Sequence, residues 1–213
     1  MFTPFITRVG VVIAATAVYG TVLAVWRSPL LAAFVAVKLP FVFVCATLIV
    51  SVFCWMAGQV TGAGLRYGEV LDSVFSAMAT AGTILLALSP VVLFFIITGA
   101  PDEGNRATMR FVHACMMLVH IIVFSVAGVV GNCILYRNLA RRVPVNCHLK
   151  LMMALWLASF AVVGSQLGWM ARPLVGSPNI SVEFIREDAL DSNFFASFFV
   201  QIIPHIIRKG KIK

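Results

Sequence analysis

Two histidines, His113 and His120, are the polar side chains whose type and spacing first suggest chemistry. They are seven residues apart in a long apolar stretch, so on a helix they lie within about 20° of the same face. Imidazoles at such a site could bind a metal ion or haem, or line a polar vestibule. No cysteine or carboxylate stands at ligand spacing from them, which makes a metal site a weak prediction. Hydrogen bonding between helices is the simpler interpretation.

Two further polar residues extend this group. Asn132 follows in the same apolar stretch, and Gln166 falls in the next one. Because consecutive spans run antiparallel, Gln166 should lie at the depth of the histidines. The sequence therefore predicts a small polar cluster of His113, His120, Asn132 and Gln166 at one end of a helix bundle, beside Arg172.

Motifs of catalysis are missing from the sequence. It contains no Gly-rich phosphate loop, no HExxH and no GxSxG. Its longest apolar stretches carry no Asp or Glu, whereas proton- and ion-coupled transporters usually keep an acidic residue within the membrane. We therefore expect a protein that is not an enzyme, has no cofactor and is not a coupled transporter.

The composition is that of a membrane protein. Of 213 residues, 61% are hydrophobic and 11% are charged, against roughly 45–50% and 25% in soluble domains. This excludes a soluble enzyme, a secreted disulfide scaffold and a disordered chain. The five cysteines form no CxxC pair, and we expect them to be free and buried as small apolar side chains.

Four stretches are long and apolar enough to cross a bilayer as helices. They cover about residues 39–58, 76–99, 111–136 and 151–171, because roughly 20 apolar residues span the hydrocarbon core. The fold class predicted is an all-α, polytopic helical membrane protein with four transmembrane helices. Residues 38–173 would form this four-helix bundle.

The two ends of the chain are predicted to lie in the membrane interface. Residues 1–37 are interpreted as interfacial or partly inserted helices, with a fifth span over residues 9–26 as the alternative. Residues 174–213 would form a turn, an acidic segment and an amphipathic tail helix with a basic end. In that tail, Ser197, Gln201 and His205 recur every fourth residue among apolar side chains, which is typical of an interfacial helix.

The basic residues give a prediction of orientation. The chain has 16 Lys and Arg against eight Asp and Glu, a balance that indicates anionic lipid headgroups as partners and not nucleic acid. With four spans, eleven basic residues fall on the side of both termini and five on the other. This favours both termini in the cytoplasm of a multi-pass protein of the cell inner membrane, although the dense basic loop at residues 137–142 favours the reverse.

Small residues are spaced for close helix packing. Gly164 and Gly168 form a GxxxG, and Ala127 and Gly131 form a similar pair. Such spacing lets helix backbones approach closely, within one bundle or between protomers. Candidate contacts to lipid or a partner are interfacial aromatic and basic side chains: Trp169, Arg172, Arg208 and Lys209.

One run of residues carries a family resemblance. Residues 166–178 read QLGWxxRPxxGSP, and EFxRE and SNFF follow downstream. With further matches from about Tyr19 to Phe195, this pattern resembles a family of small bacterial integral membrane proteins grouped with Yip1-like domains. The resemblance implies a multi-span helical fold and supplies no reaction or catalytic residues. The Met-rich start of the third span and the long basic tail depart from it.

The leading hypothesis for function is a non-enzymatic integral membrane subunit. It would act as a scaffold or assembly subunit in a membrane complex or in membrane organisation, as a homo-oligomer or in a hetero-complex. The alternative is a homo-oligomeric pore or channel lined by polar residues of the third span. A haem- or metal-binding redox protein is a third possibility.

Overall fold

The computed structural model describes residues 2–98, 106–175, 183–184 and 193–197. Within these ranges the secondary structure is helical, without strands. The elements are α1 (Phe2–Val25), α2 (Pro29–Val60), α3 (Tyr67–Thr98), α4 (Arg106–Ala140), α5 (Leu149–Met170) and the short α6 (Phe194–Ser197). Five of these helices are long and apolar enough to cross a membrane, as expected for a polytopic helical protein.

The prediction of four long apolar helices is wrong by one. Helix α1, placed by the sequence in the membrane interface, has an apolar stretch over Phe5–Val25 that is long enough to cross. Two polar residues of α1 bond within the helix: Thr16 Oγ1 donates to the carbonyl of Val12 at 2.6 Å, and Thr21 Oγ1 donates to that of Ala17 at 3.0 Å. A hydroxyl bonded in this way exposes little polarity to lipid.

Helix α2 is continuous where the sequence suggested a break. Ser28 caps its start, since the hydroxyl oxygen accepts a hydrogen bond from Leu31 N at 3.1 Å, and Pro29 follows at the first helical position. The expected boundary at residues 37 and 38 falls inside this helix. Lys38 is buried there, with 5% of its surface exposed.

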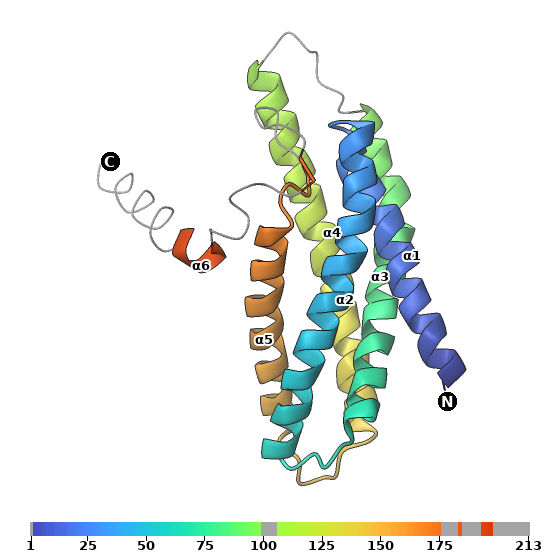
Figure 1. Ribbon diagram of the computed structural model, residues 1–213, viewed down its shortest axis with the longest axis vertical. Helices are drawn as coiled ribbons and strands as arrows, with labels where there is room; N and C mark the ends of the chain where they lie inside the picture. The colour runs from blue at the N-terminus through green and yellow to red at the C-terminus, as the bar shows by residue number, and fades with distance from the viewer. Residues whose placement is uncertain (1, 99–105, 176–182, 185–192, 198–213) are drawn as a thin grey trace.

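The long helices alternate in direction along the bundle (Figure 1). Helix α1 packs against α2 and α3, α4 packs against α3, and α5 packs against α2 while barely touching α4. Two apolar cores result. The core at the α1–α2 end, uppermost in Figure 1, joins α1 to α4 through residues such as Leu31 and Leu85, and the core at the α2–α3 end joins α2 to α5 through Val74 and Leu139.

The odd number of long helices changes the expected placement of the ends. The start of α1 and the end of α5 lie toward opposite ends of the bundle (Figure 1). The charge count that favoured both termini on one side assumed an even number of spans, so its basis is lost. Most of the predicted tail helix lies outside the described residues, which include only α6 of that segment.

The five cysteines are free, as expected, but they are not all buried. Cys54 is buried, Cys45 and Cys147 are half-buried, and Cys115 and Cys133 are exposed on α4. The prediction of burial was therefore wrong for Cys115 and Cys133. An exposed position on a lipid-facing helix suits a small apolar side chain as well as a core position does.

Candidate functional site

A buried hydrogen bond between α1 and α4 forms the centre of the candidate site. The Tyr19 hydroxyl and His120 Nδ1 are 3.0 Å apart. Both side chains are buried, Tyr19 completely and His120 with 3% of its surface exposed. The other ring nitrogen, His120 Nε2, is buried and has no hydrogen-bond partner among the described residues. Sequence reasoning identified His120 as a candidate site residue but did not identify Tyr19 as its partner.

His120 forms part of the wall of an apolar pocket of about 450 Å³. The pocket lies between α1, α2, α4 and the residues that follow α5. Of the eight other lining residues, seven are apolar and one is Ser125. The apolar ones are Leu23, Leu39, Met117, Ile121, Phe124, Leu174 and Val175. The last two belong to the sequence run that carried the family resemblance, so part of that run builds this pocket.

Two hydrogen bonds hold the chain after α5 over this part of the bundle. Trp26 Nε1 donates to the carbonyl of Val175 at 2.9 Å, and Lys38 Nζ lies 3.4 Å from the carbonyl of Ala171. Lys38 also lies 5.1 Å from the ring centroid of Phe184, within cation–π range. The buried lysine thus binds a backbone carbonyl and an aromatic ring in place of a carboxylate.

His113 lies two turns from His120 on α4 but outside this pocket. Its ring centroid is 5.5 Å from that of Trp26, and its buried Nδ1 has no hydrogen-bond partner in the part of the chain that the structure describes. Among the described residues no three His, Cys, Asp or Glu side chains stand close enough to hold a metal ion. In that part of the chain the two histidines therefore share a face without forming a metal centre.

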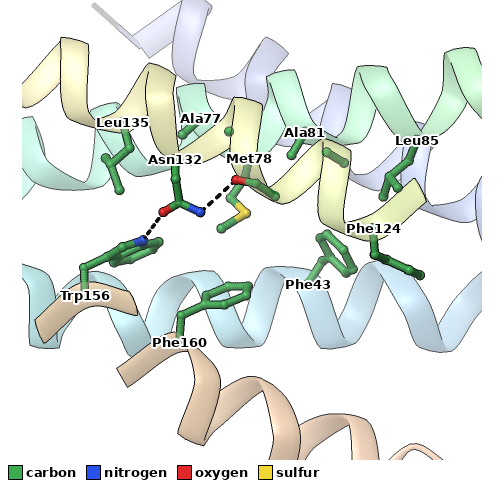
Figure 2. A pocket seen from close by; sticks show the side chains of 13 residues that line it. Phe43, Ala77, Met78, Ala81, Leu85, Phe124, Asn132, Leu135, Trp156 and Phe160 are labelled. Atoms are coloured by element: carbon green, nitrogen blue, oxygen red, sulfur yellow. Dashed lines mark hydrogen bonds between the residues drawn. The ribbon is translucent and has the colours of Figure 1, made fainter. Parts of the chain in front are cut away.

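The predicted polar cluster is divided between separate places. Asn132 is twelve residues from His120, about 18 Å along the helix at 1.5 Å per residue. Its Nδ2 donates to the carbonyl of Gly128 at 2.8 Å, and its Oδ1 accepts a hydrogen bond from Trp156 Nε1 at 3.0 Å (Figure 2). Gln166 Oε1 accepts one from Phe194 N at 3.1 Å. Asn132 therefore joins α4 to α5, and Gln166 joins α5 to α6.

A cleft separates α4 from α5 around Asn132. Its inner part is a pocket of about 100 Å³ lined by Phe43, Phe124 and Phe160 among others (Figure 2). Its outer part, of about 700 Å³, shares Gly128 and Asn132 with the inner part and has Leu157 as its α5 wall. We call the two parts together the α4–α5 cleft.

The two pairs of small residues have different surroundings. Ala127 is buried, and a methyl group added at Gly131 would lie 3.2 Å from Ala81 Cβ and 3.3 Å from the carbonyl oxygen of Ala77 on α3. This pair therefore serves packing of α4 against α3. Among the described residues, a methyl at Gly168 would meet nothing within 4 Å, and one at Gly164 would meet only Phe160 of its own helix, at 3.9 Å.

The predicted lipid or partner contacts are only partly described. The Arg172 guanidinium lies 3.3 Å from the ring centroid of Trp169, and its Nε donates to the Trp169 carbonyl at 2.8 Å. Arg172 is thus folded back on the end of α5, an arrangement typical of helix termination. Arg208 and Lys209 lie outside the described residues.

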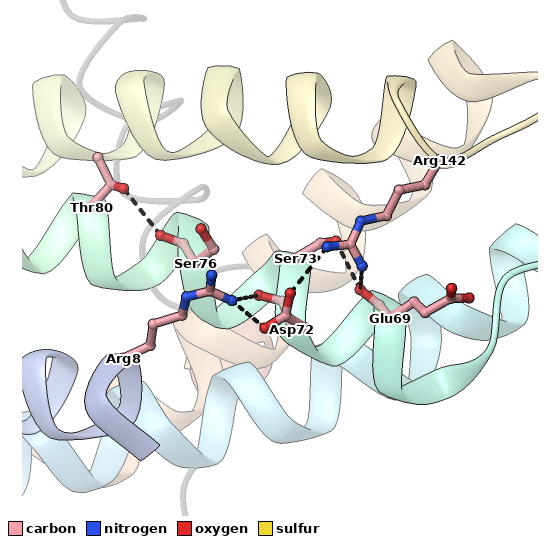
Figure 3. Close-up of polar contacts among 7 residues, drawn as sticks. All are labelled: Arg8, Glu69, Asp72, Ser73, Ser76, Thr80 and Arg142. Carbon is pink, nitrogen blue, oxygen red and sulfur yellow. Dashed lines mark hydrogen bonds and ion pairs between the residues drawn. The ribbon is translucent and has the colours of Figure 1, made fainter. Parts of the chain in front are cut away.

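A charged cluster that the sequence did not single out closes the α2–α3 end (Figure 3). Asp72 on α3 forms ion pairs with Arg8 on α1 and with Arg142, just after α4, at 3.1 Å from Arg142 Nη2. Arg142 Nη1 also lies 3.4 Å from the carbonyl of Glu69. These partly exposed contacts tie three segments together.

Comparisons with known proteins leave the function to be inferred from this geometry. No protein-family model matches the chain, and no curated protein and no solved structure is similar to it. The resemblance to Yip1-like proteins therefore stays a prediction.

Proposed function

We propose that this protein is a non-enzymatic subunit of a membrane complex, in the inner membrane, that receives a transmembrane helix of another chain at the α4–α5 cleft. The observation that carries the proposal is the unequal packing of α5. This helix packs closely along α2, where Met152 lies against Gly58, whereas its backbone approaches α4 at few positions. It meets α4 through the Trp156–Asn132 hydrogen bond. Beyond that bond, the side of α5 toward α4 is available to a partner helix or to lipid.

The face of α5 that carries Leu157 also carries, beyond the cleft, the residues that helix association favours. Gly164 and Gly168 are seven and eleven residues beyond Leu157, so all three lie within about 20° of one face of the helix. Leu157 lines the cleft. Across from it on α4, Gly128 also has no atom within 4 Å of the position of a Cβ. Small residues on both walls would let a third helix approach closely.

The pore alternative has weaker support. Its proposed lining residues, His120 and Asn132, already bond to Tyr19 and Trp156 of the same chain. A pore built by several copies would need such side chains directed toward neighbouring copies. The alternative stays a prediction without an observation in its favour.

Purification in a gentle detergent at native expression tests the assembly proposal. We expect the wild-type peak to contain a second helix-bearing chain, or further copies of this one, by mass spectrometry and molar-mass measurement. The double variant Gly164→Leu/Gly168→Leu should lose that partner, because the new side chains fill the close-approach surface. Leucine favours a helix more than glycine does, so the variant itself should fold.

Gly10→Leu is the matched control. Gly10 lies on α1, and a Cβ there also meets nothing within 4 Å. The control should keep the partner. A wild-type protein that runs as a bare monomer, or a double variant that assembles normally, would contradict the proposal.

A further inference from the structure

We propose that the helix received by the α4–α5 cleft belongs to a different protein and carries an acidic residue near one membrane surface, where its carboxylate pairs with Arg137 and Lys150. This inference rests on the proposed function and adds the chemistry of the partner. It depends on three observations: two cations at one end of the cleft, their position at the edge of the bilayer, and the lack of a spare carboxylate for them within the described helices.

Both walls of the cleft end in a basic side chain. Arg137 lines the outer part of the cleft on α4. Lys150 is seven residues before Leu157, the α5 wall of the same part, so these two residues lie within about 20° of one face of α5. That face continues to Gly164 and Gly168. A helix packed along it therefore meets the two glycines toward one end and the two cations at the other.

The hydrogen bond between Asn132 and Trp156 sets the register of the two walls. Arg137 lies five residues beyond Asn132, and Lys150 lies six residues before Trp156. At 1.5 Å per residue the two cations are displaced from that bond by about 7.5 Å and about 9 Å. The displacements have the same direction, because α4 and α5 are antiparallel (Figure 1). The two cations therefore lie at nearly the same depth.

This depth is the edge of the bilayer. Helix α5 has 22 residues, about 33 Å at 1.5 Å per residue, which matches a hydrocarbon core of about 30 Å. Lys150 is the second residue of α5, so both cations lie where the core meets the lipid headgroups. A helix docked in the cleft removes part of their contact with water. A charge that loses water is stabilised by an opposite charge beside it.

The described helices of this chain have no carboxylate to spare for these cations. Their acidic residues are Glu69 and Asp72, both on α3. Asp72 already pairs with two arginines, and Glu69 Oε2 accepts a hydrogen bond from Arg66 N at 2.9 Å. Within the described part of the chain, neither Arg137 nor Lys150 forms an ion pair. The described helices of a second copy bring the same two engaged carboxylates, which favours a different protein as the partner.

The position of Lys150 is unfavourable for α5 alone. It lies in the first turn, which has no acidic residue, and a cation there is repelled by the positive end of the helix dipole. Arg137, in the last turn of α4, is well placed for the dipole of its own helix. A carboxylate between the two side chains offsets the repulsion at Lys150 and pairs with both. Lipid phosphate is another anion at this depth, but the small residues on both walls favour a helix as its carrier.

The first experiment repeats the purification in gentle detergent with the double variant Arg137→Gln/Lys150→Gln. We expect the amount of the second chain per copy of this protein to fall at least tenfold, because the partner's carboxylate loses both cations. Arg137→Lys/Lys150→Arg keeps both charges and should retain the partner within a few-fold of wild type. Arg66→Gln/Arg141→Gln is the matched control. It removes two exposed cations from the same end, outside the residues that line the cleft, and should retain the partner as wild type does.

The second experiment identifies the carboxylate. Mass spectrometry identifies the second chain, and each Asp or Glu near an end of its apolar helices is changed to Lys in turn. One such change should abolish co-purification with the wild-type protein and restore it with Arg137→Glu/Lys150→Glu. Reciprocal rescue of this kind requires direct pairing of the charges.

The results separate this inference from the proposed function. If Gly164→Leu/Gly168→Leu loses the partner while Arg137→Gln/Lys150→Gln keeps it, the assembly cleft stands and the inference is overturned. A second chain without such an acidic residue, further copies of this chain as the only partner, or equal losses in the two glutamine variants would also overturn it. So would an Arg137→Gln/Lys150→Gln variant that loses only bound anionic phospholipid, measured by native mass spectrometry. A wild-type protein that runs as a bare monomer contradicts both.

Discussion

Two regions of α4 differ in how completely their polar side chains are hydrogen-bonded. Around residues 127–132 the helix packs closely on α3, and Asn132 has partners for both its oxygen and its nitrogen. Around residues 113–124 two histidine nitrogens are buried without partners, and a pocket lies beside one of them. The contacts of the first region hold α4 against α3 and join it to α5. The second is an arrangement that bundle stability alone does not require, since unpartnered buried groups cost free energy.

The comparison separates polar side chains whose hydrogen-bonding groups all have partners within the bundle from polar side chains that keep a buried group without one. In both regions a polar side chain of α4 meets an aromatic residue of another helix, Trp156 in one and Tyr19 in the other. The two regions differ in the number of hydrogen-bonding groups that lack a partner. The following predictions test whether that difference is real, beginning with the largest effect.

Overpacking the closely packed region should have the largest effect on stability. Gly131→Leu would drive a side chain into the backbone of α3 near Ala77. Excess volume in a packed core costs typically 1–3 kcal/mol, and we expect about 3 here because backbone cannot move aside as a side chain would. Thermal unfolding in nanodiscs measures it. The matched change Gly164→Leu, at an open position, should leave the unfolding temperature nearly unchanged, and equal losses for both would contradict the packing difference.

Removing the Asn132 amide, whose oxygen and nitrogen both have hydrogen-bond partners, should have the next largest effect on stability. Asn132→Leu keeps nearly the same volume but leaves Trp156 Nε1, on a side chain that is 2% exposed, without its acceptor. Stranding a buried donor costs about 1–3 kcal/mol, and interhelical bonds in membrane proteins fall toward the lower end. We expect a loss of about 1–2 kcal/mol in the free energy of unfolding. Trp156→Phe added to Asn132→Leu should recover part of it.

The fold could be predicted in class but not in helix number. Composition and the lengths of the apolar stretches identified four of the five long helices. Helix α1 was missed because hydropathy counts Thr16 and Thr21 as polar, whereas each hydroxyl donates to a carbonyl one turn back. The tertiary partner of Tyr19 lies 101 residues away, and no local pattern reveals it.

The site could be predicted only in part for the same reason. Helical spacing predicted that His113 and His120 lie on one face, but it could not show that Asn132 and Gln166 pair elsewhere, with Trp156 and Phe194. Spacing also could not distinguish the two small-residue pairs. Ala127 and Gly131 meet α3, while no described atom of another helix lies within 4 Å of a Cβ placed at Gly164 or Gly168. This difference depends on which helices become neighbours.

Substitutions of the buried pair Tyr19 and His120 should change the free energy of unfolding less. Removing one polar group should lower it, whereas removing both should not. Tyr19→Phe should cost about 1 kcal/mol, because His120 then loses its remaining partner. The double variant Tyr19→Phe/His120→Phe removes both polar groups together and should be at least as stable as wild type. Unfolding measurements on the two single variants and the double variant form the test. A double variant less stable than either single variant would mean that this polarity serves the fold, and the contrast with Asn132 would fail.

The ion pairs at the α2–α3 end should contribute least, and they show why charge alone does not mark a site here. Asp72→Asn removes the carboxylate between Arg8 and Arg142, whose side chains are 33% and 36% exposed. Partly exposed pairs are typically worth up to about 1 kcal/mol. The loss should shrink between about 0.01 M and about 1 M salt, as the Debye length falls from about 30 Å to about 3 Å. Arg141→Gln, at an exposed neighbour, should change the unfolding temperature less at either salt concentration. A salt-independent loss of several kcal/mol for Asp72→Asn would instead mean that this cluster stabilises the fold as much as the packing of residues 127–132 of α4 against α3.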